Sequence, residues 1–152
     1  PDCFVIEEKL KKILDIPVFH DDQHGTAIIT TAALLNALDI SGKSIKNIKV
    51  VVNGAGASAI ACTNLFKNSG VPQKNITMVD RNGVIYRGRD NLNQWKSSHA
   101  IETKNKTLDD AIKNADVFLV SKIYGNWMYG NTENNIYGYV QSKNLKLCNT
   151  YE

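Results

Sequence analysis

A short run of valines that ends in a glycine-rich turn is the feature that most constrains the fold of this chain. Residues 49–53 (KVVVN) predict a strand buried on both faces, as the strands of parallel sheets are. The turn at 54–59 (GAGASA) leads into an apolar stretch that predicts a helix over 57–68, and residues 76–80 (ITMVD) predict the next strand. Residues 49–80 therefore form one predicted βαβ unit of about the usual size.

The rest of the chain supplies further elements of the same kind. Apolar periodicity and capping signals predict helices over residues 4–14, 26–38, 91–100 and 107–114. An Asn-Gly pair predicts a small hairpin within residues 79–86, and residues 116–120 predict a third buried strand. Together these elements predict an α/β fold, part of a Rossmann-like doubly wound parallel sheet with helices on both faces. Residues 121–152 show no clear period, and we assign no element to them.

Composition and charge exclude several classes of protein. The 152 residues are 43% hydrophobic and 22% charged, which is typical of a soluble globular domain. The net charge of +3 comes from scattered basic residues, so nucleic-acid binding is not expected, and no apolar run approaches the ~20 residues of a membrane helix. Cys3, Cys62 and Cys148 lack zinc-binding spacing and the N-terminus lacks a signal-peptide pattern, so we expect a reducing, cytoplasmic location. The first residue is not Met, which is consistent with a processed or partial polypeptide.

The glycine-rich turn has the residue types that bind a dinucleotide. Gly54 permits a tight turn out of the strand, Gly56 lets a phosphate approach the backbone, and Ala59 allows the helix to pack on the strand. The helix from Ala57 offers free N–H groups and its positive dipole end to the pyrophosphate. Asp80, at the end of the next strand, is placed to accept hydrogen bonds from the adenine ribose. A purely structural glycine turn is the alternative.

The choice between NAD and NADP depends on the end of that second strand. Asp80 would repel the 2′-phosphate that distinguishes NADP, whereas Arg81 beside it could bind that phosphate. The two neighbours therefore leave both cofactors open. The acidic residue tilts the prediction slightly toward NAD.

A second motif places two carboxylates and two imidazoles just before a predicted helix. In residues 18–27 (VFHDDQHGTA), Asp21 and Asp22 are adjacent and point in different directions, so one could bind a hard cation such as Mg²⁺ while the other supports the site. The alternative is a solvated helix cap, since Asp is common at helix starts. His20 and His24 flank the pair and could indicate a transition-metal site, but ordinary hydrogen-bonded histidines are commoner.

Several segments, taken in order, resemble the malic enzymes in their bacterial-type form. Residues 16–27 (IPVFHDDQHGTA) resemble the signature segment of the family, and residues 52–61 (VNGAGASAIA) resemble its dinucleotide loop. Residues 78–89 are similar to its following strand and turn, and residues 107–119 to the run into its next strand. The resemblance covers residues 1 to about 120, and several motifs in the right order make it specific.

The resemblance implies an activity and a set of site residues. Malic enzymes oxidise malate with NAD or NADP and decarboxylate the product to pyruvate and CO2, using Mg²⁺ or Mn²⁺. By motif, Asp22 would be a metal ligand, Asp21 the neighbouring catalytic carboxylate, and Asp80 the ribose ligand. The remaining cofactor contacts implied by the resemblance are Thr26, Gly54, Gly56, Ala57 and Ser58. The family also implies a homo-oligomer, in the form of a dimer.

The departures from the family pattern limit what this chain alone should do. Residues 1–24 would be the C-terminal end of the family's N-terminal domain, residues 25–120 the first part of its NAD(P)-binding domain, and residues 121–152 a divergent tail. The family's other metal carboxylates, a Glu-Asp pair, and its catalytic tyrosine and lysine lie upstream of the matched region. We therefore expect the isolated chain to be inactive. The alternative is a non-catalytic NAD(P)-binding module, or the remnant of a split malic enzyme.

Overall fold

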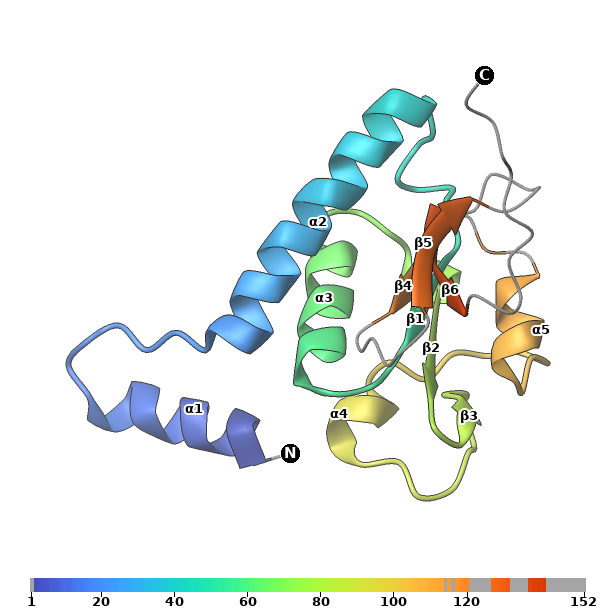
Figure 1. Cartoon of the computed structure of the whole chain (residues 1–152). Coiled ribbons are helices and arrows are strands. Elements are labelled where there is room, and N and C mark those ends of the chain that lie inside the picture. The colour runs from blue at the N-terminus through green and yellow to red at the C-terminus, as the bar shows by residue number, and fades with distance from the viewer. Residues whose placement is uncertain (1, 114, 116, 121–126, 132–136, 142–152) are drawn as a thin grey trace.

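A six-stranded sheet lies at the centre of the computed structural model, which describes residues 2–113, 115, 117–120, 127–131 and 137–141 (Figure 1). The strands are β1 (Val50–Asn53), β2 (Ile76–Asp80), β3 (Gly83–Val84), β4 (Val117–Val120), β5 (Trp127–Asn131) and β6 (Tyr137–Gln141). The helices are α1 (Asp2–Ile13), α2 (Asp21–Ser41), α3 (Ala57–Asn68), the 3₁₀ turn η1 (Gln73–Asn75), α4 (Gln94–Ser97) and α5 (Leu108–Ile112). The strand order is β3-β2-β1-β4-β6-β5.

The parallel strands around β1 have the Rossmann-like arrangement. β1 pairs in parallel with β2 on one side and with β4 on the other, and β4 pairs in parallel with β6. The short β3 returns antiparallel to β2, as the Asn-Gly turn predicts, and β5 runs antiparallel to β6. Because β2 and β4 lie on opposite sides of β1, the winding reverses beside β1, where sheets of this kind bind ligands at the carboxyl ends of their strands. The predicted partial doubly wound fold is confirmed.

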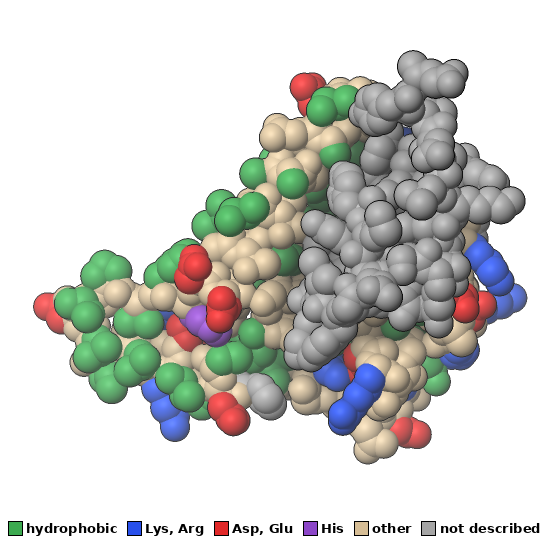
Figure 2. All heavy atoms as spheres, in the orientation of Figure 1, with side chains coloured by type: hydrophobic (Ala, Val, Ile, Leu, Met, Phe, Trp, Pro, Cys, Tyr) green, Lys and Arg blue, Asp and Glu red, His purple; other side chains and the backbone are tan. Residues whose placement is uncertain are grey.

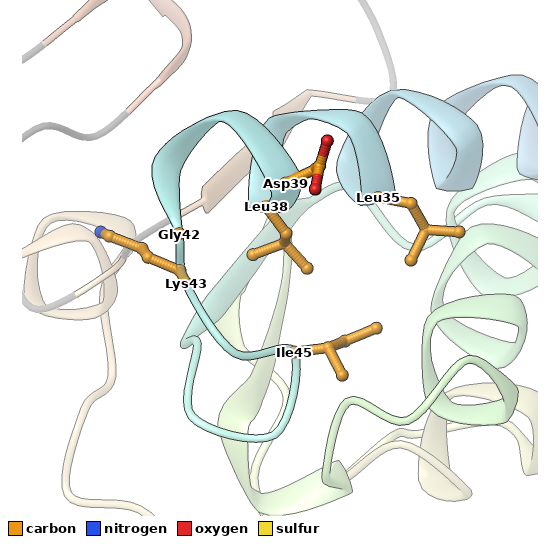
Figure 3. Close-up of a pocket in the computed structure, with 6 residues that line it drawn as sticks. All are labelled: Leu35, Leu38, Asp39, Gly42, Lys43 and Ile45. Carbon is orange, nitrogen blue, oxygen red and sulfur yellow. The ribbon is translucent and has the colours of Figure 1, made fainter.

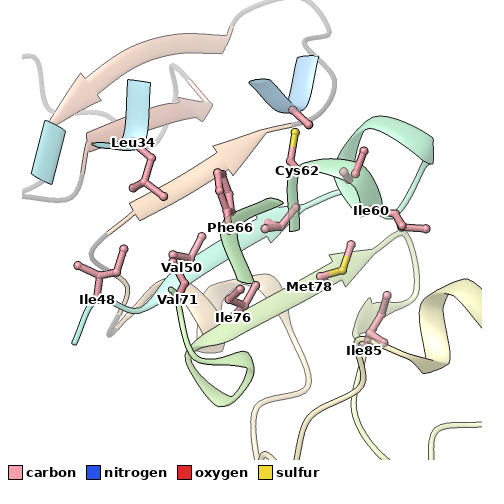
Figure 4. Packing of buried hydrophobic residues seen from close by; sticks show 14 of the residues in the cluster. Leu34, Ile48, Val50, Ile60, Cys62, Phe66, Val71, Ile76, Met78 and Ile85 are labelled. Atoms are coloured by element: carbon pink, nitrogen blue, oxygen red, sulfur yellow. The ribbon is translucent and has the colours of Figure 1, made fainter. Parts of the chain in front are cut away.

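The valines of β1 alternate between two cores, one on each face of the sheet. Val50 and Val52 belong to the larger cluster, which also contains Phe66 of α3 (Figure 4). Val51 belongs to a smaller cluster with Ala111 of α5. Figure 1 shows α2 and α3 on one side of the sheet and α5 on the other. The prediction of a strand buried on both faces, with helices covering both, is therefore confirmed.

The largest differences from the predicted limits are in α2 and α4, and strands also occur in the tail, to which no element was assigned. α2 begins at Asp21 instead of residue 26, and Gln23 in its first turn is already buried. α4 is shorter than the predicted helix because Asn91 has a left-handed φ of 61°, and Asn93 then caps α4 by accepting a hydrogen bond from the Lys96 N–H. In the tail, where no element was expected, β5 and β6 extend the sheet.

Large apolar side chains are exposed along α1, the loop after it and the outer face of α2. One face of α2 is buried against α3, while Ile29 and Ile40 on the opposite side are 73% and 87% exposed. Figure 2 shows hydrophobic side chains gathered along this edge of the molecule. Phe4 attaches α1 to the body by stacking on Trp95, with ring centroids 5.1 Å apart. In the part of the chain that the structure describes, no helix combines the length and apolar character of a membrane span.

Candidate functional site

The glycine turn forms an open cradle at the carboxyl end of β1. Gly54 has a φ of +134°, which favours glycine, and its N–H donates to the Val79 carbonyl at 2.7 Å, so the turn is tied to β2. Gly56 is the N-cap of α3 and supplies no capping side chain. A Cβ at Gly56 would meet nothing within 4 Å among the described residues, so their atoms leave space above the start of α3. The first N–H groups of a helix have no partner within it, and they bind phosphate well. The turn therefore fits a dinucleotide pyrophosphate.

A hydrogen bond joins this cradle to the Asp-Asp motif. The Ser58 hydroxyl, in the first turn of α3, donates to the main-chain carbonyl of Asp22 at 2.5 Å, across 36 residues of sequence. α2 and α3 pack along their lengths beyond this contact. The two motifs that the sequence sets thirty residues apart thus lie side by side. Ser58 was expected to contact the cofactor; its hydroxyl donates to Asp22, while its backbone N–H belongs to the open end of α3.

Asp21 and Asp22 are exposed at the start of α2. His20 is the N-cap and makes no side-chain capping bond, so neither aspartate occupies the cap position that the alternative interpretation gave them. They lie in the first turn instead, where carboxylates interact favourably with the helix dipole. A Cβ at Gly25 would overlap the Asp21 carboxylate, so the glycine makes room for that side chain. Thr26 is exposed four residues after Asp22, on the same side of the helix.

The two histidines of the motif have structural partners. His24 Nε2 lies 2.6 Å from Glu7 Oε1, which links α2 to α1, and His20 Nδ1 lies 3.3 Å from the Gln23 side-chain oxygen. Burial raises the pKa of Glu7, but hydrogen bonds from Lys11 and His24 outweigh burial and leave it below its ordinary value. No group of three or more His, Cys, Asp or Glu residues is arranged to hold a metal among the residues described. Metal binding by Asp22 stays a prediction.

Asp80 has a different environment from the one predicted for a ribose ligand. Its Oδ1 accepts from the Asn82 N–H at 2.9 Å and from Arg89 at 2.7 Å, and its Oδ2 accepts from Arg89 at 2.8 Å and Lys96 at 2.7 Å. Four bonds fill the lone-pair positions of a carboxylate. Burial raises the pKa of Asp80, but the hydrogen bonds from Lys96, Arg89 and Asn82 hold it below its usual range. Ribose binding by Asp80 stays a prediction, and it requires one of these donors to move.

Sequence reasoning missed the partners of Asp80 and the contact between Lys67 and the buried His99. Arg89 and Lys96 follow Asp80 by nine and sixteen residues, a spacing that carries no local signal. Lys67, near the end of α3, lies 3.2 Å from Nδ1 of the buried His99. Burial, and then the charge of Lys67, lower the pKa of His99 to about 4. A shallow pocket lined by Leu38 and Ile45 lies at the C-terminal end of α2, away from the cradle (Figure 3).

Comparison with known proteins agrees with this geometry. A family model for the malic enzyme NAD-binding domain matches residues 23–133. The chain is 58% identical over 119 residues to the NADP-dependent malic enzyme of Rhizobium meliloti (strain 1021), a match that covers 78% of this chain and 16% of that protein. It is 50% identical over 120 residues to the NAD-dependent malic enzyme of the same organism, with the same two coverages. The crystal structure of the NAD-dependent malic enzyme from Thermotoga maritima superimposes with a TM-score of 0.74 at 39% identity, covering 83% of this chain and 34% of that chain.

The matches concern one part of much longer proteins. The chain spans only 16% of the length of these two curated relatives. The region matched by the family model contains the glycine turn and Asp80, and it begins directly after Asp22. The match over most of the chain, the parallel sheet and the open cradle lead to one conclusion. The chain belongs to the malic enzyme family, and its residues 23–133 match the NAD-binding domain of that family.

Proposed function

We propose that this chain binds NADP or NAD at the glycine turn and serves the oxidative decarboxylation of malate to pyruvate and CO2. The observation that carries the proposal is the hydrogen bond from Ser58 to the Asp22 carbonyl. It brings the open end of α3 and two exposed carboxylates together at one place, as a reaction between a dinucleotide and a small acid requires. Malate as the substrate follows from the names of the relatives.

The groups of this chain have separate tasks in the proposed site. The N–H groups at the start of α3 hold the pyrophosphate, and the missing side chain of Gly56 lets it approach. The nicotinamide, when bound, accepts hydride from the substrate. Asp22 contributes one carboxylate to a Mg²⁺ or Mn²⁺ site whose other ligands lie outside the described residues, and Asp21 is the catalytic carboxylate beside it. We therefore expect no pyruvate formation by this chain alone.

Within this proposal, NADP is the better-supported cofactor. The sequence tilted the choice toward NAD because Asp80 was treated as a free negative charge. In the structure the Asp80 carboxylate pairs with two cations, Arg89 and Lys96, so these three side chains together carry a net charge of +1. Arg81, exposed beside it, adds a further positive charge. A 2′-phosphate would therefore be attracted to this end of β2 rather than repelled.

Assembly and location belong to the same proposal. The exposed apolar side chains of α1 and α2 support a homo-oligomer, a dimer in the simplest case, because monomers rarely show apolar patches of more than a few hundred Å². The thiols of Cys3 and Cys62 are free, which supports a cytoplasmic location.

Calorimetric titration of the purified chain with NADP and with NAD tests the function. We expect both to bind, NADP more tightly. The Cβ that Gly56→Val introduces into the cradle would meet none of the described atoms within 4 Å, so this variant should weaken NADP binding about tenfold or more while leaving the thermal midpoint unchanged.

Asn64→Val adds the same side chain at an exposed position of α3 and is the matched control, which should bind like the unmodified chain. The proposal is contradicted if the unmodified chain binds neither nucleotide. Equal binding by Gly56→Val and the unmodified chain would place the nucleotide elsewhere. Pyruvate production from malate, measured with Mn²⁺ and NADP, would contradict the expected inactivity of this chain alone.

A further inference from the structure

We propose that Ser58 is a positioning residue that transmits occupancy of the dinucleotide cradle to the turn bearing Asp21 and Asp22. The inference rests on the proposed function, since it takes the cradle as the pyrophosphate site. It assigns to Ser58 a task different from the phosphate contact that its place in the glycine turn suggests.

The hydroxyl and the backbone N–H of Ser58 have different partners in this proposal. Its hydroxyl has one proton, and that proton is donated to the Asp22 carbonyl at 2.5 Å. A pyrophosphate at the start of α3 therefore meets the backbone N–H of Ser58 and not its hydroxyl. A carbonyl oxygen has two lone pairs, so Asp22 can accept from Ser58 and still accept a bond within its own helix. Ser58 thus forms a continuous bridge, from phosphate through its main chain and side chain to Asp22.

The first turn of α2, which contains Asp22, is also stabilised by hydrogen bonds within the turn and by one from α1. Within the turn, the His20 carbonyl accepts from the N–H groups of Gln23 at 3.1 Å and His24 at 2.9 Å. From α1, Glu7 accepts from the His24 ring. Ser58 reaches the turn from the nucleotide side, 36 residues away in sequence. Fixing its main chain by a bound anion therefore restricts the Asp22 carbonyl and the hydrogen bonds of the turn.

Hydrogen exchange of backbone amides tests this coupling without any requirement for turnover. The amide of His24 is the reporter, because it donates within the turn. The unmodified chain, Ser58→Ala and Ser58→Thr are each measured without NADP and at saturating NADP. NADP should slow exchange at His24 about two- to tenfold in the unmodified chain, the change that one net hydrogen bond produces. Ser58→Ala should still bind NADP through its N–H but lose the slowing, and Ser58→Thr, which keeps the hydroxyl, should restore it.

Ser98→Ala is the matched control, because the Ser98 hydroxyl also donates to a main-chain carbonyl, that of Trp95, at 2.7 Å. Ser98→Ala should keep the NADP-dependent slowing at His24. Equal slowing in Ser58→Ala and the unmodified chain, both with NADP bound, overturns the role of Ser58 and leaves the proposed function standing. Absence of NADP binding by the unmodified chain overturns the proposed function and this inference with it.

Discussion

The two acidic regions of this chain have opposite roles in its structure. Both were predicted as functional sites, with Asp22 as a metal ligand, Asp21 as the catalytic carboxylate beside it and Asp80 as a ribose ligand. In the structure the Asp80 side chain is 6% exposed and accepts four hydrogen bonds, two of them from Arg89. Asp21 and Asp22 are exposed. A motif therefore identifies where a carboxylate lies along the chain, but only its neighbours decide whether it is available to a ligand.

The difference has an energetic cause. A buried carboxylate is stable in its charged form only with donors that replace water, and Arg89 and Lys96 provide that replacement for Asp80. The exposed pair keeps its water and needs no protein donor. Asp80 should therefore contribute mainly to the stability of the fold, and the exposed pair mainly to ligand binding. The following changes test that division.

Asp80→Asn should have the largest effect on stability. The substitution keeps the shape of the side chain but leaves Arg89, 11% exposed, and Lys96, 26% exposed, without their counter-charge. We expect the free energy of unfolding to fall by about 2–4 kcal/mol, somewhat less than for a fully buried ion pair. Urea denaturation followed by circular dichroism measures the loss.

Asp22→Asn is the matched control for Asp80→Asn. The same chemical change at this exposed first-turn position should alter the free energy of unfolding by no more than about 1 kcal/mol, the most that an exposed carboxylate gains from the helix dipole. Equal losses in the two variants would remove the distinction between the two acidic regions. A loss confined to Asp22→Asn would reverse it.

As the pH is lowered, protonation of the buried His99 should destabilise the chain before protonation of Asp80 does. Unfolded histidine binds a proton below about pH 6.5, whereas His99 in the folded chain has a pKa of about 4. Between these values the unfolded state binds more protons, so stability falls as the pH is lowered, by up to about 3 kcal/mol in total. His99→Gln should flatten this part of the pH profile. Asp80 affects stability at lower pH than His99 does. Its pKa in the folded chain is below the value near 3.8 of an unfolded aspartate, so its contribution to the free energy of unfolding is lost only when the pH falls below about 3.8.

The elements that the sequence predicted well are those decided by local interactions. The helix over 57–68 and the strand over 76–80 agree residue for residue with α3 and β2. Glycine before α3 and β-branched residues in the strands set these limits locally. The start of α2 was missed by five residues because Asp-Asp-Gln-His resembles a loop, and His20 is not a preferred cap. Burial of Gln23 extends the helix there, and no local pattern reports it.

The site was predictable in its parts but not in its contacts. The cradle at Gly54 and Gly56 follows from local sequence, because only certain backbone angles and side-chain sizes allow it. The bond from Ser58 to Asp22 depends on how α3 packs against α2, which is a property of the tertiary structure. The hydrogen bonds that Arg89 and Lys96 donate to Asp80 likewise depend on the tertiary structure, because the segment after β3 must return to the end of β2. Distances between segments, and not residue types, separate the two acidic regions.

Asp21→Asn should have a small effect on stability, and it sharpens the comparison most. If the Asp21 carboxylate acts on the fold only through the dipole of α2, its neutralisation should lower the free energy of unfolding by about 0.3–1 kcal/mol at low salt. The loss should nearly disappear in 1 M NaCl, where the screening length is about 3 Å. Urea denaturation at both salt concentrations measures this. A loss above about 2 kcal/mol, or one that persists at high salt, would show that Asp21 is a structural anchor like Asp80. A small, screened loss means that the fold leaves this carboxylate available to a ligand.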